Sequence, residues 1–281
     1  MTVRSQFSSG SGLAAAVPCL GPPKDRWTLS RIVTFLCLPA AFVFASQSAA
    51  AEVSRGALWK VVQACVLNHE LTGAAFPCLE VNVSDGVERG YVLFRQPFGE
   101  PDLVLSPTRE IVGVEERSLQ ALNAPNYFED AWIARTFLHR ALQEPLARDD
   151  VVLAVNSRLS RTQDQLHIHI GCLSSEAKKT LHNLAPALLE TRWMPLGRPF
   201  RGLEFWGRLV IQDSLAGTNP FHLAAEEWHN QIKDRSQLTL AVAGIQLADG
   251  RDGFVLLASY KNPFGEYSAE DFLDYSGTRC R

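Results

Sequence analysis

Two histidines, His167 and His169, alternate with apolar residues in the stretch 165–173 and are well placed to do chemistry together. A period of two is typical of a half-buried β-strand, whose successive side chains point to opposite faces of a sheet. The apolar residues would then face a core, and both imidazoles would project from the other face. Neutral imidazoles can attack phosphorus near pH 7, and a His-x-His pair can equally hold zinc.

The segment just before this strand carries polar side chains that suit phosphate chemistry. It follows the apolar run 151–155, so the pattern predicts a strand, a polar turn and then the histidine strand. Guanidinium, hydroxyl and amide groups can hold phosphate oxygens and stabilise the charge that develops during attack. The candidate phosphate-binding residues are Asn156, Arg158, Arg161, Thr162 and Gln163. Spacing alone leaves phosphate chemistry, a metal site and a merely polar strand face as open alternatives.

The histidine strand resembles the signature of the histidine-triad (HIT) superfamily, in which three histidines alternate with apolar residues. Its members are nucleotide hydrolases and transferases whose middle histidine attacks the α-phosphorus. By position, the resemblance makes His169 the nucleophile and His167 its supporting neighbour. Gly171 stands where the third histidine would be, and Arg161 or Thr162 could supply the donor that is lost there.

The wider segment is similar to one branch of that superfamily, the bacterial CDP-diacylglycerol pyrophosphatases. The likeness covers roughly residues 56–281 and includes the stretches 87–92, 106–108, 156–169, 224–227 and 254–258. It implies an α+β fold, with a HIT-like antiparallel sheet and flanking helices. It also implies hydrolysis of CDP-diacylglycerol to CMP and phosphatidate through a nucleotidylyl-histidine intermediate, with no cofactor and no metal. HIT relatives often dimerise, so a homodimer is a further expectation.

Two other functions remain open on the sequence. One is an exported metalloprotein in which His167 and His169 bind a metal together with Asp102 or another histidine. The other is a nucleotide- or lipid-binding module that lost catalysis together with its third histidine. Asp102 also stands where many HIT proteins have a histidine, and Thr108 stands where they have a lysine, so roles carried by that motif do not transfer to this chain.

The first 51 residues have the layout of a disordered start followed by a signal or membrane-anchor segment. Three basic residues precede the apolar run 32–45, and the small residues 48–51 follow it. This run is shorter than the ~20 residues that span a bilayer, but it approaches that length when extended to residue 51. A cleaved signal and a single-pass anchor of the bacterial inner membrane both place the body, residues 52–281, on the periplasmic side.

Composition and cysteine content agree with an exported globular enzyme. The chain has 281 residues, a net charge of −3 and no basic patch with interleaved aromatics, which argues against a nucleic-acid partner. An oxidising compartment permits disulfides, and the four cysteines of the body allow three pairings. Turn residues between Cys65 and Cys78 favour that pair, and Cys172 with Cys280 is a second candidate pair; four free buried thiols are the alternative.

Periodicity also predicts the elements that must position the histidines. Helices are expected over 56–66, 126–142 and 268–275. Strands are expected over 238–245 and 253–260, joined by Asp-Gly turns that are typical of hairpins. Strands that cluster as hairpins between helices indicate an antiparallel sheet.

Overall fold

A computed structural model describes residues 55–96, 102–142, 145–197, 200, 202–228, 234–260 and 268–274. All of them belong to one compact unit, Ser46–Arg281. The predicted signal or anchor segment and Cys280 lie outside the described residues.

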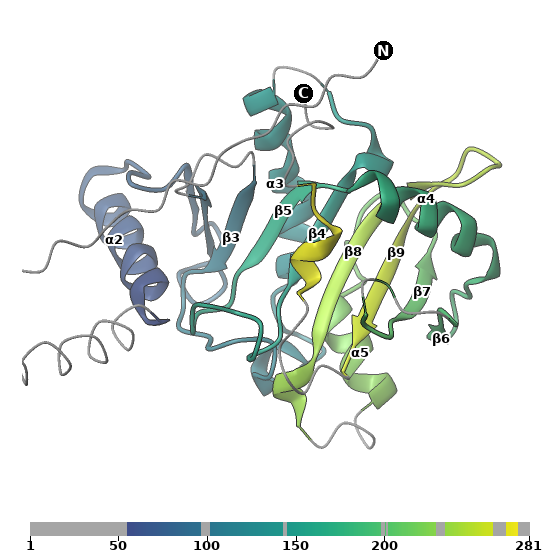
Figure 1. Cartoon of the computed structure of the whole chain (residues 1–281). Helices are drawn as coiled ribbons and strands as arrows, with labels where there is room; N and C mark the ends of the chain where they lie inside the picture. The colour runs from purple at the N-terminus through teal and green to yellow at the C-terminus, as the bar shows by residue number, and fades with distance from the viewer. Residues whose placement is uncertain are drawn as a thin grey trace, which may run out of the picture. The chain divides into compact units, whose positions relative to one another are not determined.

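One antiparallel sheet of nine strands organises this unit, in the order β1-β2-β3-β5-β4-β8-β9-β7-β6 (Figure 1). The strands are β1 (Glu80–Asn82), β2 (Tyr91–Arg95), β3 (Leu103–Pro107), β4 (Val151–Val155), β5 (Ile168–Cys172), β6 (Met194–Pro195), β7 (Trp206–Val210), β8 (Thr239–Gln246) and β9 (Asp252–Ser259). Within the described residues, four α-helices accompany them: α2 (Ala57–Thr72), α3 (Tyr127–Leu142), α4 (Ser175–Leu184) and α5 (Pro220–Trp228). The predicted α+β fold with an antiparallel sheet is therefore confirmed.

Short 3₁₀ turns complete the described elements. They are η1 (Arg117–Leu119), η2 (Arg148–Asp150), η3 (Ala185–Ala187), η4 (Arg235–Gln237) and η5 (Ala269–Phe272). The last of these, η5, packs over β4 and is the yellow turn in front of that strand in Figure 1.

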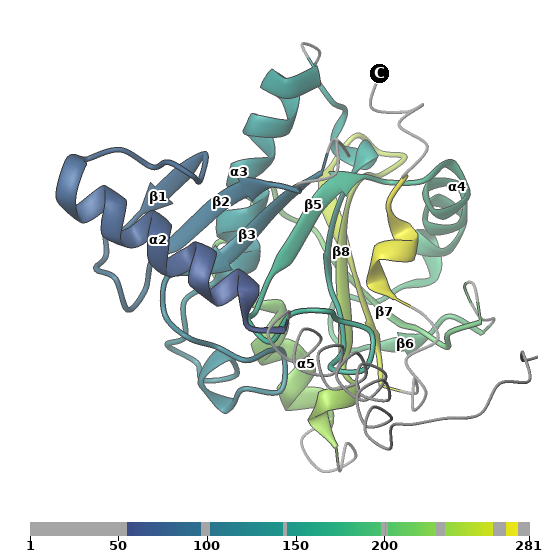
Figure 2. The same cartoon turned by 60° about the vertical axis from the view of Figure 1, so that its left-hand side comes forward.

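Helices cover both faces of the sheet. On one face, α3 and α5 bury a large core in which the rings of Phe128 and Phe221 lie 4.9 Å apart. On the other face, α4 and η5 pack over β4, β8 and β9, and α2 packs over β1 and β2 (Figure 2). The alternation of each strand assigns its residues to these faces: Ile168 and Ile170 lie on the α3 face, and His169 lies on the opposite face.

The two halves of the sheet have the same topology. The order β2-β3-β5-β4 is repeated by β6-β7-β9-β8, with α3 and α5 at equivalent places in the chain. The halves join where β4 pairs with β8, for example at Val152 and Ala243. In the second half, β9 is the counterpart of β5. The side chains of Val255 and Leu257 in β9 lie on the same sheet face as the side chain of His169 in β5. Both candidate histidines therefore belong to one of two similar halves.

Several predicted elements differ in length from those observed. The helix expected over 56–66 continues to Thr72 and ends at Gly73, whose φ of 76° suits a glycine at a helix C-terminus. The helix expected over 268–275 is only the short turn η5, which a capping box at Ser268 and Asp271 holds. The expected helix over 126–142 and the expected strands over 151–155, 238–245 and 253–260 are confirmed within one residue.

Candidate active site

The two histidines lie next to one another in the middle of the sheet. His169 pairs with Ala154 of β4 on one side and with Val104 of β3 on the other, and His167 directly precedes β5. Their rings meet edge to face, with centroids 5.1 Å apart. Both side chains are buried, with exposures of 8% for His167 and 5% for His169. The predicted juxtaposition of two imidazoles is therefore present.

The protein fixes the tautomer of His167. Its Nδ1 lies 2.6 Å from the carbonyl oxygen of Gln165, which can only accept a hydrogen bond, so Nδ1 carries the proton. Burial, together with the neighbouring His169, lowers the pKa of His167 to about 4. This ring is therefore neutral at pH 7.

A polar group lies near each ring nitrogen of His169, and Nε2 makes no hydrogen bond within the described part of the chain. The side-chain amide nitrogen of Gln96 lies 3.0 Å from Nδ1, and the carboxylate of Glu270 lies 3.1 Å from Nε2. Burial lowers the pKa of His169, and the nearby charge of Glu270 opposes that shift. A neutral imidazole keeps one nitrogen lone pair, which is the form that can attack phosphorus.

Glu270 reaches the site from the C-terminal part of the chain and is held there by Asn156. The Asn156 side-chain amide donates a hydrogen bond to Glu270. Its oxygen accepts bonds from the Ser268 hydroxyl at 2.6 Å and from the backbone N–H of Ala269 at 2.9 Å. Asn156, predicted to hold phosphate, thus fixes η5 beside the nucleophile candidate.

Backbone hydrogen bonds attach η5 to the end of the histidine strand. The N–H of Ser174 donates to the carbonyl of Phe272, and the N–H of Asp274 donates to the carbonyl of Cys172, both at 2.8 Å. The position of Glu270 is therefore set from β5 itself. Sequence patterns missed this residue because its acidic segment, 268–275, has the composition of an ordinary helix start.

A carboxylate stands at the place of the missing third histidine. A Cβ on Gly171 would lie 2.4 Å from the Asp102 carboxylate oxygen and 2.3 Å from a methyl group of Leu273. Asp102 is buried, and it directly precedes β3, the neighbour of β5. Glycine at 171 is thus required by the side chains that fill the space next to it.

The other predicted phosphate-binding residues lie in the polar turn between β4 and β5. The buried guanidinium of Arg161 makes two 2.7 Å bonds to Glu115 and a 3.2 Å bond to Asp164, and its charge helps to lower the pKa of His167. Gln163 accepts a bond from the backbone N–H of Leu58 at the start of α2. Arg158 and Thr162 are exposed. Among the described interactions, none of the predicted phosphate-binding side chains contacts His169 directly, and Asn156 is linked to it through Glu270.

The described cysteines are disulfide-bonded. Cys65 and Cys78, the pair favoured by the sequence, are joined across the buried side of α2. Cys172 is also disulfide-bonded, and its predicted partner, Cys280, lies outside the described residues. Cys172 points into the α3-side core, away from the histidines.

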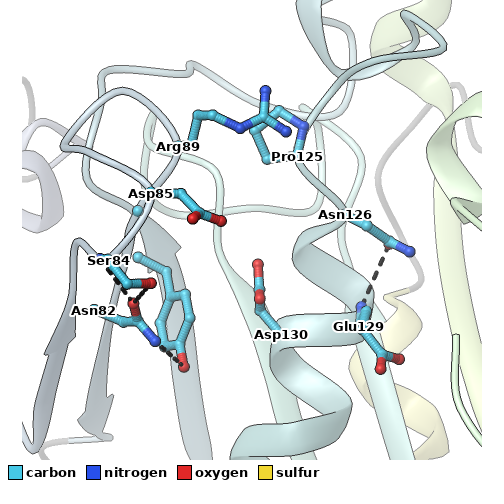
Figure 3. A pocket seen from close by; sticks show the side chains of 10 residues that line it. Asn82, Ser84, Asp85, Arg89, Pro125, Asn126, Glu129 and Asp130 are labelled. Atoms are coloured by element: carbon cyan, nitrogen blue, oxygen red, sulfur yellow. Dashed lines mark hydrogen bonds between the residues drawn. The ribbon is translucent and has the colours of Figure 1, made fainter. Parts of the chain in front are cut away.

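A polar cavity of about 160 Å³ lies between the start of α3 and the strands β1 and β2. Asp85 and Asp130 point toward one another across it in Figure 3, and burial raises the pKa of Asp130 to about 6. Tyr91, which lines it, belongs to the α3 face of the sheet, so the cavity and the histidines are on opposite faces. It is separate from the histidine site.

Two absences hold for the part of the chain that the structure describes. No three His, Cys, Asp or Glu side chains there converge in a way that could hold a metal ion. Among the same residues, every helix is too short or too polar to cross a bilayer.

Comparison with known proteins identifies the family of this chain. A sequence model of the family "CDP-diacylglycerol pyrophosphatase" matches residues 53–281. The chain is also similar to a CDP-diacylglycerol pyrophosphatase of Yersinia pestis, with 32% identity over 256 residues, which cover 90% of this chain and 94% of that protein. The matched span contains His167, His169, Asn156 and Glu270. The chain belongs to the CDP-diacylglycerol pyrophosphatase family.

Proposed function

We propose that this protein hydrolyses the pyrophosphate bond of CDP-diacylglycerol to CMP and phosphatidate, with His169 as the nucleophile. The family match supports the substrate. The observation that carries the mechanism is the buried, neutral ring of His169 held between the Gln96 amide and the Glu270 carboxylate. An uncharged nucleophile of this kind needs no metal ion to activate it.

In the first step, a ring nitrogen of His169 forms a bond to the α-phosphorus, and phosphatidate leaves with the bridging oxygen. For this bond to form, one ring nitrogen of His169 must lose its contact with the protein so that the α-phosphorus can approach it. Glu270 is the partner that an anionic diphosphate displaces, because like charges repel and its side chain is partly exposed. The Gln96 amide is neutral, and it can rotate so that its oxygen accepts a hydrogen bond from a protonated Nδ1. Attack then proceeds through Nε2.

In the second step, water attacks the nucleotidylyl-histidine. The displaced Glu270 carboxylate remains attached to the end of β5 through η5, next to the new phosphorus–nitrogen bond. There it accepts a proton from the attacking water as the new oxygen–phosphorus bond forms, and CMP leaves the ring. His167 packs against His169 and keeps the reacting ring in place.

The location of the protein is part of the same proposal. The basic flank and the apolar run 32–45 support an inner-membrane protein with its body in the periplasm. The Cys65–Cys78 disulfide supports an oxidising compartment. A membrane-attached enzyme would meet its lipid-linked substrate at high local concentration.

The test is CMP release from CDP-diacylglycerol by the detergent-solubilised full chain in EDTA. The wild type should release CMP, and His169→Ala should release none. His182→Ala is the matched control, because His182 lies exposed on α4 and pairs with Asp149. Activity that requires added zinc would support the metalloprotein alternative. A wild type without any activity would instead support the binding-module alternative.

A further inference from the structure

Helix α2 carries two apolar stripes. One contains Leu58, Val62 and Cys65, which are buried against β1 and β2. The other recurs at helical spacing on the exposed side through the residues Ala57, Val61, Ala64, Leu67 and Leu71. Leu67 is 55% exposed and Leu71 is 75% exposed. A surface helix of a globular protein ordinarily has a single apolar stripe, with polar residues opposite, so the second stripe needs an explanation.

The rest of the structure keeps this second stripe facing outward. The Cys65–Cys78 disulfide fixes the rotation of the helix about its axis. At the start of α2, Gln163 accepts a bond from the N–H of Leu58, and Arg55 pairs with Asp164 at 2.7 Å. The chain after the helix adds Phe76, which is 77% exposed and whose backbone carbonyl accepts a 2.8 Å hydrogen bond from the Asn68 side chain of α2. The helix therefore has no freedom to turn its second stripe inward.

The sequence upstream of α2 indicates what covers the stripe. The apolar run 32–45, predicted to enter the membrane, is followed by only eleven residues, 46–56, before the helix. Even fully extended, that stretch spans no more than ~40 Å. A helix attached so closely to a bilayer, with an apolar stripe along its length, is suited to lie in the membrane interface.

We infer that the second apolar stripe of α2, with Val61, Leu67 and Leu71, docks together with the nearby Phe76 on the surface of the lipid bilayer that holds the substrate. This inference rests on the proposed function and extends it. Docking of α2 would place His169 near the lipid head groups that carry the diphosphate.

The position of α2 relative to His169 fits this task. Phe94, Val104 and His169 stand side by side across β2, β3 and β5. Phe94 packs against the cluster beneath α2, so the helix and His169 are on the same face of the sheet. Neighbouring strands are ~4.8 Å apart, so β2, over which α2 packs, lies about 10 Å from the histidine strand in the plane of the sheet. A diphosphate group at the bilayer surface beside α2 would have to move only a short distance away from the bilayer to reach His169.

The experiment compares two double variants of the full chain on two forms of CDP-diacylglycerol. Leu67→Ser with Leu71→Ser removes the outer stripe. Leu122→Ser with Ile133→Ser is the matched control, because these side chains are also exposed and lie outside α2. One substrate form is long-chain lipid in mixed micelles, and the other is a short-chain lipid below its critical micelle concentration. The segment 32–45 remains in every protein, so any difference reports on α2 alone.

The α2 variant should lose about tenfold in kcat/KM on micelles, through a higher KM, and should retain wild-type kcat/KM on the monomeric substrate. The control variant should match the wild type on both. Unchanged micellar kinetics, or an equal loss on both substrates, would overturn the inference. So would a wild-type dimer by light scattering that the α2 variant converts to monomer, since the stripe would then bind a second copy. A wild type inactive on both substrates would instead contradict the proposed function.

Discussion

The carboxylate of Glu270 lies 3.1 Å from Nε2 of His169, although the two residues belong to different halves of the chain. This contact exists because η5, which follows the second half of the sheet, returns to the end of β5 and is bonded there by Ser174, Asp274 and Asn156. The second half has apolar residues on the corresponding sheet face, yet it completes the site of the first.

Glu270→Gln should slow the second chemical step more than the first. The amide cannot accept a proton from water, so we expect kcat to fall on the order of 100-fold and nucleotidylyl-histidine to accumulate. Intact-protein mass spectrometry after rapid acid-free quenching would detect the CMP-sized addition. Glu190→Gln, on an exposed loop, is the matched control. Loss of activity without any adduct would show that Glu270 does not act after attack.

Replacement of His167 should make stability less dependent on pH. Its pKa is about 4 in the folded protein and about 6.5 when unfolded, so the unfolded chain binds more protons between these values. The free energy of unfolding therefore falls as pH is lowered from about 7 to about 4, by up to about 3 kcal/mol from this residue alone. Urea unfolding across that range, for the wild type and His167→Gln, measures the difference. A parallel pH dependence of the two proteins would contradict the assignment.

The histidine pair could be predicted from the sequence because strand alternation is a local rule. Placing His167 and His169 on one face required only a period of two. Glu270 could not be found in this way, since its place depends on how η5 returns over β4. The repeated strand order was also hidden, because β5 carries histidines where β9 carries Val255 and Leu257.

The roles of the polar turn show a second limit of sequence reasoning. Residue type predicted that Arg161 and Gln163 bind phosphate, but residue type alone does not distinguish ligand binding from contacts that support the fold. Arg161 is buried with two carboxylates, and Gln163 binds the start of α2. Partners so distant in the sequence can be identified only from the folded chain.

Gly171→Ala should destabilise the protein by about 1–3 kcal/mol, because its Cβ would overlap Asp102 and Leu273. The double variant with Leu273→Ala should cost less than the sum of the single variants, since removing the leucine methyl groups makes room for the alanine. Thermal unfolding of the three proteins tests this coupling. Additive losses would mean that Leu273 does not limit the space at position 171.

Asp130→Asn should stabilise the protein above pH 6. Burial raises the pKa of Asp130 from an ordinary value near 3.8 to about 6, so the folded protein carries the ionised form at a cost at neutral pH. The carboxyl group lines a cavity that is open to solvent, which reduces the expected gain to about 1–2 kcal/mol. The gain should decline as pH falls through 6, be small at pH 4 and vanish near pH 3, where Asp130 is protonated in both the folded and the unfolded state. Chemical denaturation at pH 4 and pH 8 would test this, and an equal effect at both pH values would show that lost hydrogen bonding, not ionisation, determines the change.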